Sequence, residues 1–267
     1  MVYFLALIDF VLSLVMLFPV KDERGRYRTF PYMTVTLIIF NVAIHVLFVW
    51  LLPTRLGQPA TEALQESLMH LPTAILEGEG LGALTLISSA FLHANWSHLL
   101  GNMFFLFFFG RKLEDVLGPM KMVLFYLVCA LVSGVVSVVG NAALPYTQGE
   151  IPSLGASGAV MGLLGAYLFL YHEQQIHLIV VLGLLPIPAT TRMPVWGFMV
   201  YTISRDFVRG WLERIFEAQG YIYSMIGFFA HLGGVMAGLI CIYFFLPAAM
   251  LHYRHRPRRT SRGLFDG

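Results

Sequence analysis

Six apolar segments dominate this 267-residue chain, and they constrain its fold more than any other feature. Hydrophobic residues make up 58% of the chain and charged residues 12%, against about 25% charged residues in soluble domains. This composition excludes an ordinary soluble domain, and disorder requires low hydrophobicity. The runs are continuous rather than alternating, which favours membrane helices over a barrel. The expected spans are 31–52, 96–110, 120–143, 156–171, 193–212 and 226–249.

The segments predict an all-α, polytopic membrane protein whose membrane domain covers 31–250. A hydrophobic and basic leader over 1–30 precedes this domain, and a basic tail over 251–267 follows it. The apolar run at residues 1–18 is open to three interpretations: a seventh span, an interfacial helix, or sequence upstream of the true start. We hypothesise that translation starts at Met16 or that residues 1–15 are dispensable. Residues 176–188 are apolar but short and end in proline, which favours a loop or a partly inserted segment.

The distribution of charged residues predicts how the chain is oriented across the membrane. An even number of spans places both termini on one side, and basic residues gather at both ends, so both termini are expected in the cytoplasm. The loops over 53–95 and 144–155 are mainly acidic and suit the outer side. Short tails favour a bacterial plasma membrane. The net charge of +2 is too small to indicate a nucleic-acid partner.

Polar residues inside a membrane are costly, so each is a functional candidate. His93, His98 and Asn102 lie where the second span begins on the outer side. At about 100° per residue, His98 and Asn102 share one helix face.

Two glycine-rich segments carry the remaining candidates. Ser157 opens the fourth span, where the free N–H groups of a helix start stabilise negative charge. His231 lies early in the sixth span. Each is followed by glycines at helical spacing, which predicts that the two helices pack closely. These glycines are Gly158, Gly162 and Gly165 in the fourth span and Gly234 and Gly238 in the sixth.

Close packing of these faces would bring Ser157 and His231 together at the depth of His98. A serine becomes a nucleophile when an adjacent base accepts its proton, and histidine titrates in the useful range. His98, Asn102 and the Ser157 backbone N–H could donate to an oxyanion. We find no acidic residue near these clusters that could orient His231, so a dyad is favoured over a triad.

These residues resemble the motifs of the rhomboid family of intramembrane serine proteases, over roughly residues 16–250. The matching positions are His93-x4-His98-x3-Asn102, Gly155-x-Ser157-Gly158, Ala230-His231-Leu-Gly-Gly234 through Gly238, Phe30-Pro-Tyr-Met-Thr34, and Gly110-Arg-Lys-Leu-Glu114.

The resemblance implies a six-transmembrane-helix rhomboid bundle with a Ser157/His231 dyad and an oxyanion site at His98 and Asn102. It also implies cleavage of single-pass membrane proteins near the outer membrane boundary, with no metal or nucleotide cofactor. Supporting positions would be His93, Gly155, Gly158 and Gly234.

Three features depart from the family pattern. Leu84 and Thr85 replace a tryptophan–arginine pair of the first outer loop, and Met161 replaces a tyrosine that stacks on the histidine. The fifth span, past which substrates commonly enter in this family, carries Arg205, Asp206 and Arg209, and their role stays open.

Two other functions fit a membrane bundle with buried polar groups. One is a catalytically silent rhomboid-fold protein that binds and sorts membrane proteins, although the intact Ser157 and His231 argue against it. The other is a small-solute channel or transporter. Zinc hydrolysis is disfavoured because His172 and His177 are five residues apart, about 140° around a helix.

Overall fold

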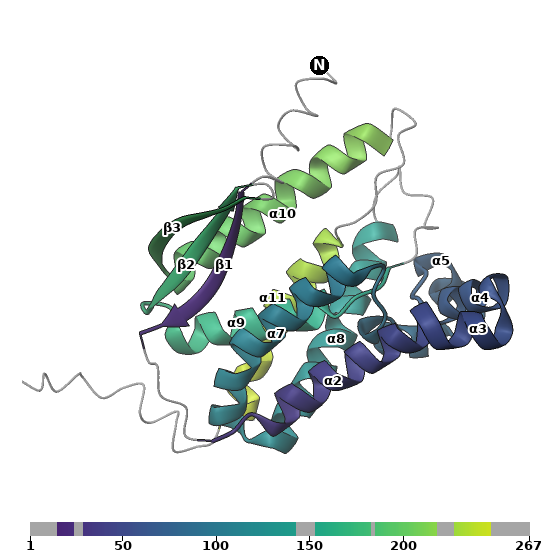
Figure 1. Ribbon diagram of the computed structural model, residues 1–267, viewed down its shortest axis with the longest axis horizontal. Coiled ribbons are helices and arrows are strands. Elements are labelled where there is room, and N and C mark those ends of the chain that lie inside the picture. Colours follow the sequence, from purple (N-terminus) through teal and green to yellow (C-terminus); the bar gives the residue numbers. More distant parts are fainter. Residues whose placement is uncertain (1–14, 24–28, 143–152, 183–184, 218–226, 247–267) are drawn as a thin grey trace, which may run out of the picture.

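The computed structural model describes residues 15–23, 29–142, 153–182, 185–217 and 227–246. Helices lie at each of the six expected positions (Figure 1). They are α2 (Tyr32–Val46), continued by the π-helical turn η1 (Leu47–Leu51) and α3 (Leu52–Leu56), then α7 (Trp96–Leu117), α8 (Pro119–Ala142), α9 (Ser157–Tyr171), α10 (Val195–Glu217) and α11 (Phe228–Phe245). The connection between α3 and α7 forms α4 (Gln58–Leu68), α5 (Pro72–Glu77), η2 (Gly82–Leu84), α6 (Thr85–Ser88) and η3 (Ser89–Phe91).

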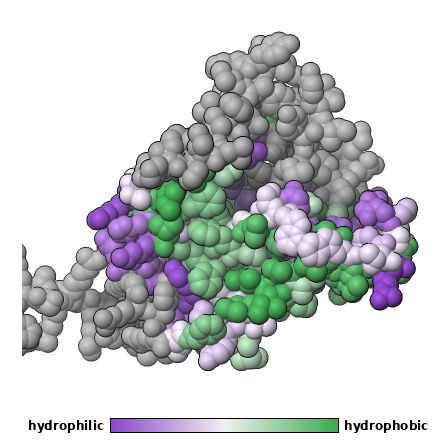
Figure 2. Space-filling view, in the orientation of Figure 1, coloured by the Kyte–Doolittle hydropathy of each residue, from purple (hydrophilic) through white to green (hydrophobic). Residues whose placement is uncertain are grey.

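Three helices of the described residues are long and apolar enough to cross a membrane by themselves: Tyr32–Leu56, Pro119–Asn141 and Phe228–Phe245. Helix α9 is shorter, and its residues Gly158–Tyr167 are all buried. Such burial is expected of a helix that is apolar on every side. Figure 2 shows a continuous apolar surface across the middle of the visible face, with hydrophilic residues toward its two ends. This pattern is that of an integral membrane protein.

The expectation of an all-α fold is wrong in one respect, because the chain also forms a three-stranded antiparallel sheet. Strand β1 (Val15–Asp22) pairs with β2 (Gln175–Leu182), which pairs with β3 (Leu185–Pro194). Strands β2 and β3 therefore cover the stretch expected to be a loop or inserted segment. The β1–β2 register shifts between Pro19 and Lys21, as expected where proline has no N–H to donate.

The predicted N-terminal segment is only partly described. Residues 15–22 of this segment form β1 rather than part of a span, and Met16 lies within that strand. Residues 1–14, and the predicted basic tail over 251–267, lie outside the described residues. The hypothesis of a start at Met16 stays a prediction.

A buried ion pair attaches β1 to the helical bundle. Lys112 Nζ on α7 lies 3.2 Å from Asp22 Oδ2. The hydroxyl of Tyr167 on α9 donates to the same oxygen at 2.7 Å. Because both charges are shielded from solvent, each depends on the other for its stability.

Glu114 on α7 joins two of the family motifs, Phe30–Thr34 and Gly110–Glu114, by hydrogen bonds. Its Oε1 accepts from the Met33 N–H at 2.9 Å, and its Oε2 accepts from the Thr34 N–H and hydroxyl at 2.7 Å each. These groups belong to the first turn of α2, where backbone N–H groups lack helical partners and a carboxylate is favourable. Gly110 lies one turn before Glu114, where a Cβ would come within 2.9 Å of Thr34 Cγ2.

Helix α9 packs most extensively against α11, as the glycine spacing predicted. A Cβ at Gly234 would overlap the carbonyl oxygen of Gly158, and a Cβ at Gly238 would overlap that of Gly162. The two backbones are therefore in direct contact, and the prediction that the glycine faces meet is confirmed.

Candidate active site

One cavity of about 1200 Å³ is lined by Ser157, His231, His98 and Asn102. The structure thus brings the principal residues of all three predicted clusters to a single space. Gly155 and Gly158 also line it, whereas His93 and Gly234 do not.

Backbone hydrogen bonds hold the residues just before Ser157. The residue pair His70 and Ser153 exchange backbone hydrogen bonds of 3.2 and 2.9 Å, and Gly155 N–H donates to the Ser89 carbonyl at 2.9 Å. Two residues after Gly155, helix α9 begins at Ser157. The serine therefore lies where the helix N–H groups are without helical acceptors.

Only glycine fits position 155. Its φ is +124°, and a Cβ there would lie 2.9 Å from His98 Nε2 and 3.6 Å from Asn102 Nδ2. The side chains of the two predicted oxyanion donors therefore occupy the space that a side chain at position 155 would need.

Helix α7 presents these two donors on one face, as predicted. Asn95 caps the helix, since its side chain accepts from the His98 N–H at 2.9 Å. One turn later, Asn102 is 7% exposed, and among the described residues its Nδ2 has no hydrogen-bond partner. A buried donor without a partner costs about 1–3 kcal/mol, and Asn102 lines the cavity.

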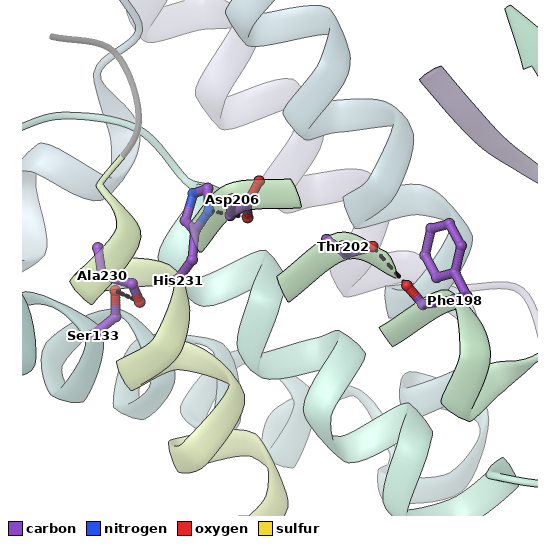
Figure 3. Close-up of polar contacts among 6 residues, drawn as sticks. All are labelled: Ser133, Phe198, Thr202, Asp206, Ala230 and His231. Carbon is purple, nitrogen blue, oxygen red and sulfur yellow. Dashed lines mark hydrogen bonds and ion pairs between the residues drawn. The ribbon is translucent and has the colours of Figure 1, made fainter. Parts of the chain in front are cut away.

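His231 lies in the first turn of α11 and has an acidic partner. Its Nδ1 is 2.7 Å from Oδ2 of Asp206 on α10 (Figure 3). Asp206 is 5% exposed. The prediction that no acidic residue could orient His231 is therefore wrong. The sequence signal was the polarity of the predicted fifth span at Arg205, Asp206 and Arg209, to which no role was assigned.

Ser133 on α8 is a second residue that sequence reasoning missed. Its hydroxyl donates to the carbonyl of Ala230 at 2.9 Å, next to His231 (Figure 3). A Cβ at Gly158 would overlap the Ser133 hydroxyl oxygen. Ser133 thus fixes the start of α11 against α8, and the absence of a side chain at Gly158 leaves room for the Ser133 hydroxyl.

His93 lies behind His98, with ring centroids 5.3 Å apart. It is buried and lies 6.4 Å from the ring of His45 on α2. The ring of Trp96 packs edge-on against His45 at 4.7 Å. A supporting role for His93 stays a prediction. Met161, the departure from the family's tyrosine, lines the same cavity as His231.

Comparison with known proteins gives one family. The rhomboid domain of the family models matches residues 82–248. The chain is 31% identical over 167 residues to RHOMBOID-like protein 12, mitochondrial, of Arabidopsis thaliana, covering 58% of this chain and 44% of that protein. It is 29% identical over 154 residues to the human presenilin-associated rhomboid-like protein, mitochondrial, covering 58% and 36%. It is 26% identical over 179 residues to rhomboid protein 1, mitochondrial, of Saccharomyces cerevisiae, covering 67% and 46%. The chain therefore spans less than half the length of each of these relatives.

Proposed function

Because the chain belongs to the rhomboid family, we propose that it is an intramembrane serine endopeptidase with Ser157 as nucleophile and His231 as general base. The observation that carries the proposal is the cavity that a helix-start serine, a histidine and a buried, unpaired amide donor share. These are the groups that acyl transfer requires in one place.

The reaction uses these groups in two steps. Ser157 Oγ loses its proton to His231 Nε2 and bonds to the substrate carbonyl carbon. The resulting tetrahedral intermediate breaks its C–N bond as His231 returns the proton to the leaving amine. Water then attacks the acyl-serine by the same route, which releases the new carboxyl end and restores Ser157.

The oxyanion would form beside Gly155. A Cβ added at Gly155 would lie within 3.6 Å of both His98 Nε2 and Asn102 Nδ2, which supports a role for these two side chains as donors. The Ser157 backbone N–H is the third proposed donor. Donors fixed before the reaction stabilise the charge that develops in the transition state.

The proposed substrates are single-pass membrane proteins, cut near the outer membrane boundary. The cavity extends from Ser157 along α7 and α10, where Phe104, Phe105 and Phe198 line it. An apolar substrate segment is suited to such walls. We propose that α2 with α3, α7, α8, α9, α10 and α11 are the six spans, with both termini cytoplasmic. A bacterial plasma membrane stays a prediction, because the relatives named above are mitochondrial proteins of eukaryotes.

Two assays test the proposal on the purified full chain: labelling by a fluorophosphonate, and cleavage of a reporter protein with one transmembrane helix in liposomes. Wild type should label and cleave, whereas Ser157→Ala and His231→Ala should do neither. Asn102→Ala should lower kcat by roughly 100- to 1000-fold, the usual cost of losing one oxyanion donor.

Ser67→Ala is the matched control, because Ser67 is exposed and donates only to a local helix carbonyl. It should behave as wild type. A wild type that binds the reporter but neither labels nor cleaves would instead support the silent binding and sorting protein.

A further inference from the structure

We infer that Asp206 is a positioning residue for His231, so that the site works as a Ser157–His231–Asp206 triad. This inference rests on the proposed function and changes its chemistry, since the family resemblance implies a dyad. The acid comes from α10, a helix that carries none of the predicted site residues.

The geometry is that of an orienting hydrogen bond. At 2.7 Å, the contact between His231 Nδ1 and Asp206 Oδ2 lies at the short end of the range for an ionised partner. A carboxylate only accepts, so Nδ1 carries the proton and Nε2 is left as the acceptor. That tautomer is the one that can receive the proton of Ser157.

Burial and charge make this contact specific. The side chains of His231 and Asp206 are 17% and 7% exposed. The other ionisable side chains that line the cavity are His70, His98, Tyr201, Arg205 and Arg209. Asp206 is therefore the one carboxylate among the described lining residues, and it touches the ring that becomes positively charged during the reaction.

Such a carboxylate favours the transition state over the ground state. When Ser157 gives up its proton, His231 becomes an imidazolium, and the adjacent negative charge stabilises it. Removing the equivalent acid from serine-protease triads lowers kcat by roughly 10⁴-fold. Helix α11 also constrains His231, so we expect a loss on the order of 10²- to 10⁴-fold here.

A purely structural role would have a different signature. If the bond only held α10 against α11, its loss would loosen the cavity, raise KM and lower thermal stability. An orienting role lowers kcat and the rate of Ser157 labelling while KM stays within about twofold of wild type.

The test compares Asp206→Asn, Asp206→Glu and Asp115→Asn with wild type. The asparagine would keep the size of the side chain and remove its charge, whereas glutamate restores the charge. Asp115 receives the same chemical change but lies near the C-terminal end of α7, where it accepts from Thr29. We expect Asp206→Asn to lose kcat and labelling rate, Asp206→Glu to recover at least tenfold of that loss, and Asp115→Asn to match wild type.

A second measurement needs no change at position 206. Low-temperature proton NMR of the otherwise unaltered chain should show a strongly deshielded imidazole N–H resonance that His231→Ala removes. Absence of this resonance overturns the inference even if Asp206→Asn fails to fold.

The outcomes separate the two proposals. If wild type labels at Ser157 and Asp206→Asn labels and cleaves within threefold of it, the triad is wrong and the protease stands. The triad is equally wrong if only KM changes. If wild type neither labels nor cleaves, both proposals fail together.

Discussion

Replacing Gly238 by alanine tests whether direct backbone contact between α9 and α11 holds the site together. The new Cβ would lie 2.7 Å from the carbonyl carbon of Gly162 and 3.0 Å from the N of Ala166, and it would overlap the Gly162 oxygen. All three are backbone atoms, so no side-chain rotation can relieve the overlap. Ordinary carbon contacts are about 3.5–4.0 Å, so the helices must separate by roughly 1 Å.

That separation has two measurable consequences. Overpacking of this kind costs about 1–3 kcal/mol in free energy of unfolding. Gly238 lies seven residues after His231, roughly 10 Å along the axis, so the shift also moves His231 relative to Ser157. A displacement of about 1 Å can cost roughly 100-fold in rate, and we expect a 10- to 100-fold lower kcat.

The assay is SDS-induced unfolding in mixed micelles, followed by tryptophan fluorescence, together with reporter cleavage. Gly197→Ala is the matched control, because a Cβ at that helical glycine would meet only side-chain atoms, the nearest at 3.4 Å. It should be neutral or slightly stabilising. If Gly238→Ala unfolds within about 0.5 kcal/mol of the control, a margin of roughly twofold in the equilibrium constant, and retains its kcat, then direct backbone contact does not hold the site together.

Three further predictions concern stability, measured by the same unfolding titration. Glu114→Gln should lose about 1–3 kcal/mol, because it removes the charge that caps α2; exposed Glu66→Gln should be neutral. Burial lowers the pKa of His70 to about 4, whereas its ordinary pKa is about 6.5. Between about pH 4 and pH 6.5, His70 therefore binds fewer protons in the folded state than in the unfolded chain. Stability should therefore fall as pH drops from 7.5 to 4.5, by about 2–3 kcal/mol from this group, and His70→Gln should lose that part of the dependence. Asp22→Asn should cost about 3–5 kcal/mol because it removes the carboxylate that is paired with the buried Lys112 ammonium. The double change Asp22→Leu with Lys112→Met should recover much of that loss; a single variant as stable as wild type would contradict a stabilising buried pair.

Local patterns were sufficient for much of the site. Helical periodicity predicted that His98 and Asn102 share a face, and glycine spacing predicted the contact between α9 and α11. Ser157 at a helix start followed from the glycines around it. Each of these inferences starts from spacing within two or three turns of one helix, and that is why the sequence alone was informative.

The sheet and the acidic partner depend on contacts that no local pattern contains. Strand β1 meets β2 about 160 residues later, and neither strand shows its partner in its own sequence. Asp206 precedes His231 by 25 residues, and their contact depends on where α10 crosses α11. Polarity within a span marked Asp206 as unusual, but only the crossing of the two helices identifies its partner.

Helix α11 has one face packed tightly against α9 and other faces that are partly exposed. Toward α9, Gly234 and Gly238 tolerate no added carbon, whereas Met236 and Ile240 on other faces are 47% and 59% exposed. In homologous chains, the glycine positions should therefore stay invariant while the exposed ones exchange freely among apolar residues. Substitution rates along this helix should rise and fall with a period of about 3.6 residues, and their minima should trace the seam against α9.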